Sequence, residues 1–134
     1  GVPQNISKAR ATIDLARPYA SSEVQAFEDF ILIAATAELP DMSAVSRAFA
    51  HVDPDMRADA LRRVFRLNRN AGLYVLQDRL AELGYYAGAK NGLMTAPTLE
   101  AMNSACAELD IVQACEMGPM RAVARRIIHE ALFQ

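Results

Sequence analysis

Residues 75–92 read VLQDRLAELGYYAGAKNG, and TAPTLEAM follows them at residues 95–102. Leucines at helical spacing predict an apolar stripe made by Leu73, Leu76, Leu80 and Leu83. Gly84 follows this stripe, and glycine is the residue that most readily takes the positive φ found at a helix C-terminus. The sequence therefore predicts a helix that ends near Gly84.

A short loop and a second helix are expected after Gly84. Asn91 and Gly92 form a strong turn dipeptide, because both residues tolerate left-handed backbone angles. Thr95 can cap the following helix, and Pro97 falls in its first turn, where a missing N–H costs nothing. The whole stretch is thus predicted to be a helix–loop–helix unit.

The residues of this unit resemble the small helical peptidoglycan-binding domain of bacterial cell-wall hydrolases. The shared pattern is Leu-Gln-x-x-Leu-x-x-Leu-Gly-Tyr-x-x-Gly, a polar residue before glycine, and then Thr-x-x-Ala followed by a hydrophobic residue. It is carried here by Leu76, Gln77, Leu80, Leu83, Gly84, Tyr85, Gly88, Asn91, Gly92, Thr98, Ala101 and Met102. The resemblance spans about residues 71–106 and implies a non-catalytic domain that binds peptidoglycan.

The chain departs from the family pattern at several positions. The family usually has Asp where this chain has Asn91, and a Phe-Gly-Pro-like run where this chain has LMTAP at residues 93–97. The family also closes its second helix with Phe-Gln, which Ala105 and Cys106 replace. A helical fold that has lost the glycan site is therefore the alternative.

Composition is typical of a globular protein. The 134 residues are 52% hydrophobic and 22% charged, which suits one folded unit with a sizeable core. The formal net charge of −2 gives no general attraction to nucleic acid. The longest near-continuous apolar run, residues 30–35, falls far short of the roughly 20 residues needed to cross a bilayer. Because Gly1 to Pro3 look like a processed start, we expect a signal peptide or parent chain outside this sequence.

The rest of the chain is predicted to be helical throughout, with a break at residues 68–72. No alternating strand pattern appears. We predict an all-α fold, a compact bundle of about seven short helices that contains the helix–loop–helix unit. An N-terminal helical portion of unknown role, residues 1–52 with a first helix around Ile6 to Ala16, is expected to pack with a peptidoglycan-binding-like domain, residues 53–134, as one globular unit.

The predicted ligand-binding residues lie in and around the loop. An exposed aromatic ring beside amide and hydroxyl groups suits a sugar, and either Tyr85 or Tyr86 could face a groove. Tyr86, Asn91 and Thr98 are candidates for contacts to glycan or to stem peptide, with Lys90 available to a stem carboxylate. The alternative is that Tyr85 is core, Asn91 is only a turn residue and Thr98 only supports the second helix.

A row of arginines, Arg62, Arg63, Arg66 and Arg69, is expected on one outer helix face. Such a row could meet nucleic acid, anionic wall polymers or an acidic protein. A solvated helix face is the simpler interpretation, and with a slightly acidic chain we predict no nucleic-acid partner.

Cys106 and Cys115 are close enough in sequence to form a disulfide, which would fit an oxidising compartment. Two reduced, buried cysteines are the alternative. Two cysteines at this spacing, with only His51 and His129 elsewhere, do not predict a metal site.

Catalysis has little support in the sequence. The acidic residues are scattered without a recognisable acid/base setting, so we predict neither an enzyme nor a cofactor. Two functions remain. One is a binding module that anchors a bacterial envelope protein to peptidoglycan, in the periplasm or cell envelope. The other is a helical protein–protein interaction domain.

Overall fold

The computed structural model describes residues 21–39 and 42–133. This part of the chain contains seven α-helices, one 3-10 turn and no strand, which confirms the all-α prediction. The elements are α2 (Ser22–Thr36), α3 (Ser43–Ala50), η2 (Pro54–Met56), α4 (Arg57–Leu67), α5 (Arg69–Glu82), α6 (Ala96–Glu108), α7 (Val112–Met117) and α8 (Ala122–Leu132). The helix predicted around Ile6 to Ala16 lies outside the described residues.

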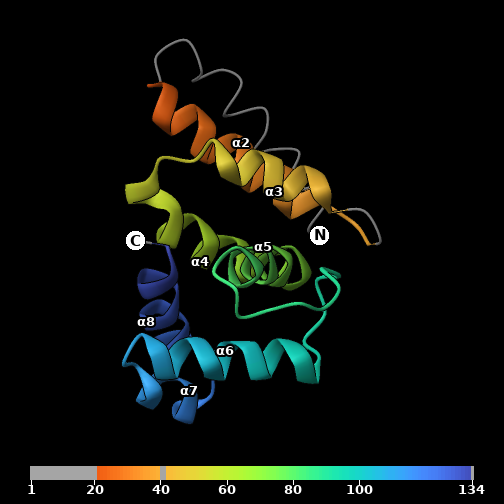
Figure 1. Cartoon of the computed structure of the whole chain (residues 1–134). Coiled ribbons are helices and arrows are strands. Elements are labelled where there is room, and N and C mark those ends of the chain that lie inside the picture. Colours follow the sequence, from red (N-terminus) through yellow and green to blue (C-terminus); the bar gives the residue numbers. More distant parts are fainter. Residues whose placement is uncertain (1–20, 40–41, 134) are drawn as a thin grey trace.

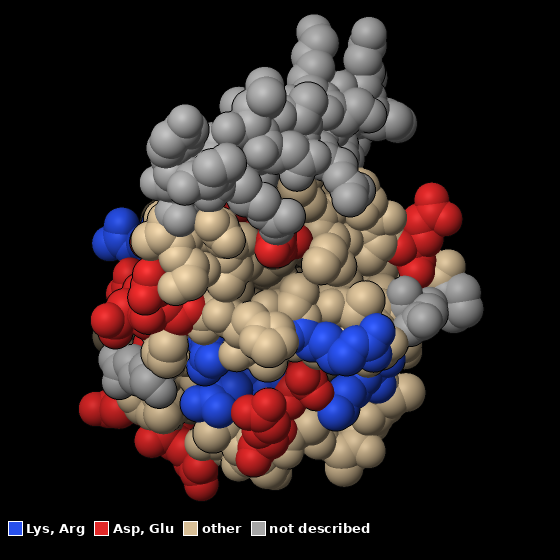
Figure 2. Space-filling view, turned by 90° about the horizontal axis from the view of Figure 1, so that it is seen from above, with Lys and Arg blue, Asp and Glu red and all other residues tan. Residues whose placement is uncertain are grey.

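The helices are arranged in three tiers, with α2 and α3 above, α4 and α5 in the middle and α6 to α8 below (Figure 1). α4 contacts α2, α5 and α8, and α5 contacts α3 and α6, so these two helices are the centre of the bundle. The core runs through all three tiers, from Phe30 in α2 through Leu76 in α5 to Ile128 in α8. No helix in the described ranges is long and apolar enough to cross a membrane. Seen from above, basic and acidic side chains lie side by side on the surface (Figure 2).

The break between α4 and α5 is one residue, Asn68, and not the whole of residues 68–72 as the sequence suggested. The Asn68 side-chain oxygen accepts a hydrogen bond from Ala71 N at 3.4 Å and caps α5. Its amide nitrogen donates to the carbonyl oxygens of Ala34 and Ala37, both at 2.9 Å. Because Asn68 caps α5 so directly, α5 can begin at Arg69.

Gly72 lies inside α5, where its lack of a side chain allows α4 and α5 to approach closely. A Cβ atom at this position would lie 2.7 Å from Cδ2 of Phe65. The sequence pattern treated this glycine as a helix breaker. Its absent side chain instead makes room for an aromatic ring of the neighbouring helix.

The other end of α5 follows the sequence closely. Gly84 has a φ of 87°, and Tyr85 N donates to Leu80 O at 2.9 Å while Gly84 N donates to Ala81 O at 3.1 Å. This is the hydrogen-bond pattern of a Schellman cap. The predicted stripe is buried at Leu73, Leu76 and Leu80, whereas Leu83 is exposed.

α6 ends in a similar cap, but with an aspartate in the left-handed position. Asp110 has a φ of 59°, and Ile111 N donates to Cys106 O at 2.9 Å. The chain then forms the short helix α7, which the sequence pattern did not predict. Cys106 of α6 and Cys115 of α7 form a disulfide, so this short helix is covalently tied to its neighbour.

We expect Asp110→Gly to raise the free energy of unfolding by about 0.5–1 kcal/mol, because glycine adopts a positive φ without steric cost. Urea titration of the oxidised protein measures the change. Asp110→Ala is the matched control, since it retains the Cβ atom and should give no gain. A glycine variant no more stable than the alanine variant would contradict this explanation.

Candidate functional site

The side-chain amide of Gln77 holds the loop of the helix–loop–helix unit. Gln77 is fully buried in α5. Its Oε1 accepts hydrogen bonds from the backbone N–H groups of Asn91 at 3.0 Å and Gly92 at 2.9 Å. Its Nε2 donates to Leu93 O and Thr98 Oγ1, both at 2.9 Å, and lies 3.2 Å from Asn91 Oδ1. One amide therefore fixes both the turn and the first turn of α6.

Asn91 and Thr98, two of the predicted ligand residues, belong to this framework. Asn91 Oδ1 also accepts from Leu93 N at 3.0 Å, which closes the turn on itself. Thr98 is fully buried, and its hydroxyl lies 3.0 Å from that of Thr95. Both side chains are thus engaged within the protein.

The two tyrosines differ in burial. The Tyr86 ring is only 7% exposed, and its hydroxyl donates to Ala89 O at 2.5 Å. Tyr85 is half-buried and donates to Glu108 Oε2 at 2.6 Å, and this hydrogen bond to a carboxylate raises the pKa of Tyr85. Tyr85 therefore ties the loop to α6, while Tyr86 packs against its own loop.

The Lys90 side chain pairs with Asp78 of α5, with 2.7 Å between Nζ and Oδ1. The hydrogen bond and the carboxylate charge raise the pKa of Lys90, which keeps the amine charged. The structure therefore brings Asn91 and Thr98 together around Gln77, and places Lys90 beside a separate group of charges.

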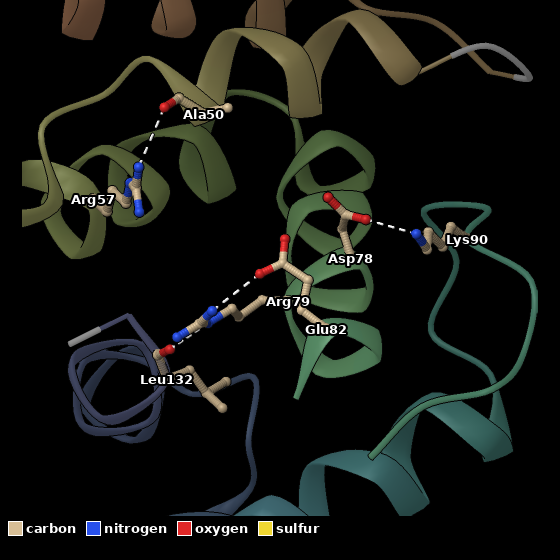
Figure 3. Close-up of polar contacts among 7 residues, drawn as sticks. All are labelled: Ala50, Arg57, Asp78, Arg79, Glu82, Lys90 and Leu132. Carbon is tan, nitrogen blue, oxygen red and sulfur yellow. Dashed lines mark hydrogen bonds and ion pairs between the residues drawn. The ribbon is translucent and has the colours of Figure 1, made fainter. Parts of the chain in front are cut away.

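Asp78 lines a cleft of about 170 Å³ between α3, α5 and the C-terminal end of α8. The lining residues are Ser46, Phe49, Ala50, Pro54, Arg57, Val75, Asp78, Arg79, Glu82 and Phe133. Figure 3 shows Arg57 on one side of this space and the charged side chains of α5 on the other. Two guanidinium groups and two carboxylates thus share one small cleft.

Both arginines of the cleft are held in place by backbone carbonyls. Arg57 Nε donates to Val52 O at 3.0 Å, and its Nη2 donates to Ala50 O at 3.2 Å. Arg79 Nε donates to Leu132 O at 2.7 Å, and its Nη1 pairs with Glu82 Oε2 at 3.0 Å. The guanidinium groups are therefore pre-ordered before any ligand arrives, which lowers the entropic cost of binding.

This arrangement suits binding of a group that carries both an ammonium and a carboxylate. Arginine matches carboxylates in a planar geometry, and aspartate and glutamate accept from amines. The cleft residues were not among the predicted site residues. The i, i+4 spacing of Asp78 and Glu82, which places both carboxylates on one face of α5, is the sequence signal that could have revealed them.

The described residues provide neither a metal-binding cluster nor a free cysteine thiol. No group of three His, Cys, Asp or Glu side chains there could hold a metal ion. Both cysteine sulfurs are in the disulfide.

His129 is buried in α8 and stacks on Phe65 of α4, with 5.2 Å between ring centroids. Neither ring nitrogen has a hydrogen-bond partner within the described part of the chain. Burial, followed by the charges of Arg125 and Arg62, lowers the pKa of His129 to about 3. The imidazole is therefore neutral at physiological pH and acts as part of the core.

No protein-family model, curated protein or solved structure matches this chain. The resemblance to peptidoglycan-binding domains thus rests on the motif residues alone.

We expect Gln77→Leu to lower the free energy of unfolding by about 3 kcal/mol or more, because it removes every hydrogen bond that Gln77 makes to the loop and to α6. Gln113→Leu, a change at an exposed glutamine, is the control and should cost little. Urea denaturation followed by circular dichroism compares the two variants. Equal midpoints would show that the amide does not hold the loop.

Stability should also fall in acid because of His129. A histidine with a depressed folded pKa binds protons more readily in the unfolded chain, so its contribution is present above pH 6.5 and is lost as pH falls towards 3. The expected loss at pH 5 is about 2 kcal/mol.

Urea midpoints measured from pH 7.5 down to 4 test this expectation against His129→Leu, which should flatten the profile. His51→Gln, at an exposed histidine, is the control for loss of a histidine as such. Parallel profiles for the wild-type protein and His129→Leu would show that His129 does not cause the acid sensitivity.

Proposed function

We propose that this chain is a non-catalytic binding module that anchors a bacterial envelope protein to peptidoglycan through the peptide stem. The cleft of mixed charge between α3 and α5 is the observation that carries the proposal. The motif residues of the helix–loop–helix unit, about residues 71–106, support it independently. In this proposal the protein works in the periplasm or cell envelope.

The size and chemistry of the cleft favour the stem peptide as the ligand. Pockets for drug-sized ligands have volumes of about 300–1,000 Å³, so a cleft of about 170 Å³ suits the end of a peptide and not a disaccharide. Stem peptides are short and carry free carboxylate and amino groups. The Tyr86 ring is covered in the structure, which also favours the peptide over the sugar.

Each charged residue of the cleft has a role in this proposal. Arg57 and Arg79 receive the ligand carboxylate, while Asp78 and Glu82 receive its ammonium group. Lys90 competes with the ligand in this arrangement, because its amine pairs with the Asp78 carboxylate at 2.7 Å until the ligand amine displaces it. The exchange is inexpensive, since ion pairs at exposed positions contribute only about 0–1 kcal/mol.

One observation favours the second candidate function, a protein–protein interaction domain that keeps the helical fold without the glycan site. The Asn91 side-chain oxygen and the Thr98 hydroxyl form hydrogen bonds within the protein, and Thr98 is fully buried. In that case the helix–loop–helix unit serves as a scaffold.

Co-sedimentation with purified peptidoglycan sacculi tests the proposal. We expect the wild-type protein to sediment and the double variant Asp78→Asn/Glu82→Gln to bind about tenfold more weakly, because both negative charges that pair with the ligand amine are lost. Glu100→Gln/Glu116→Gln removes two exposed carboxylates away from the cleft and is the charge-matched control. Circular dichroism confirms that each variant is folded.

Two results would contradict the proposal. Failure of the folded wild-type protein to sediment would exclude peptidoglycan and favour a protein partner. Equal losses in the cleft variant and the control would show that binding does not use the cleft.

A further inference from the structure

A second hollow, of about 460 Å³, lies between α4 and α8. We call it the arginine hollow, because its lining residues are Arg62, Arg66, Ala122, Val123, Arg125 and Arg126. The sequence predicted a solvated face of four arginines on one helix, but only Arg62, Arg63 and Arg66 lie in α4, because Arg69 is the first residue of α5. The fold adds two arginines from α8, far along the chain, and so turns a row into a concave cationic site.

The charges in this hollow are only partly neutralised. Arg62 pairs with Asp59 at 2.6 Å, and Arg126 has Glu130 at 3.9 Å. Within the described residues no ion pair involves Arg66 or Arg125. The carboxylates present therefore leave a cationic surplus at the centre of the site.

Arg125 illustrates the uncompensated positive charge of this site. Its guanidinium lies over the Phe65 ring, 5.2 Å from the centroid, and its Nε is buried without a hydrogen-bond partner in the described part of the chain. Burial, together with the charges of Arg69 and Arg66, lowers the pKa of Arg125. An oxyanion bound to the exposed part of the arginine cluster would pair with these charges and relieve the repulsion among them.

We propose that the arginine hollow is a docking site for an acidic segment of a partner protein. The surroundings favour a peptide, because Val123 is 65% exposed and lies beside Ala122 among the arginines. Arginine together with exposed apolar side chains is typical of protein interfaces. The net charge of −2 does not favour a nucleic-acid duplex, and the hollow is larger than a single phosphate group requires.

This site is independent of the proposed peptidoglycan cleft. The cleft is formed by α3, η2, the first residue of α4, α5 and the residue after α8. The hollow uses later residues of α4 together with α8, and the two sites share no lining residue. A result at one site therefore leaves the other proposal standing.

Fluorescence anisotropy with the full chain tests the docking site. The probe is a short fluorescein-labelled peptide of glutamates interrupted by leucines, and the control peptide has glutamine at each glutamate. We expect saturable binding of the acidic peptide that weakens as salt is added, and no binding of the control. Failure of the acidic peptide to bind, or equal binding of the two peptides, would overturn the proposal.

Substitutions then locate the site. Arg66→Gln, at an exposed position, should weaken binding about fivefold, and Arg66→Gln/Arg125→Gln should weaken it further. Arg125→Lys keeps a positive charge near Phe65 and serves as the control for misfolding caused by the Arg125→Gln change. Arg47→Gln removes an exposed arginine of α3 and is the charge-matched control. A loss with Arg47→Gln equal to that with Arg66→Gln, or tighter binding of a labelled DNA duplex than of the peptide, would overturn the proposal.

Discussion

The buried amide of Gln77 is the constraint on which the rest of the helix–loop–helix unit depends. It is one of few polar side chains in a core that is otherwise apolar, and its oxygen and nitrogen are both satisfied by the loop and by α6. Since a buried amide without partners is costly, α5 and the loop must form together. Glutamine thus converts a flexible glycine-rich loop into a fixed connection between two tiers of the bundle.

The elements that the sequence predicted well are those set by local chemistry. Gly84 ends α5 because its backbone takes a positive φ, and the leucine stripe is buried over Leu73 to Leu80. The extent of α5 and the existence of α7 depended on distant contacts. Asn68 caps α5 while also binding carbonyls of α2, and no local pattern reveals that second role.

The candidate sites were harder to predict than the fold for the same reason. Asn91 and Thr98 were recognised as polar residues beside a turn, but their hydrogen bonds go to Gln77, which lies 14 and 21 residues away. The arginines of α4 were visible in the sequence, whereas the concave site that they form with Arg125 depends on how α8 packs. Sequence patterns therefore identified the polar residues, and tertiary packing decided which of them are available to a ligand.

The hydrogen bonds of Asn68 also bear on how the chain can be divided. This side chain joins the end of α2 to the start of α5. Phe30 of α2 also packs at a tilt against Phe49 of α3, which in turn contacts Phe133 after α8. A fragment that began at residue 53 would lose the carbonyl partners of Asn68 and expose Phe133. Helices α2 and α3 therefore complete the packing of the bundle. An isolated C-terminal fragment would lack these contacts, so its stability would not represent that of the intact chain.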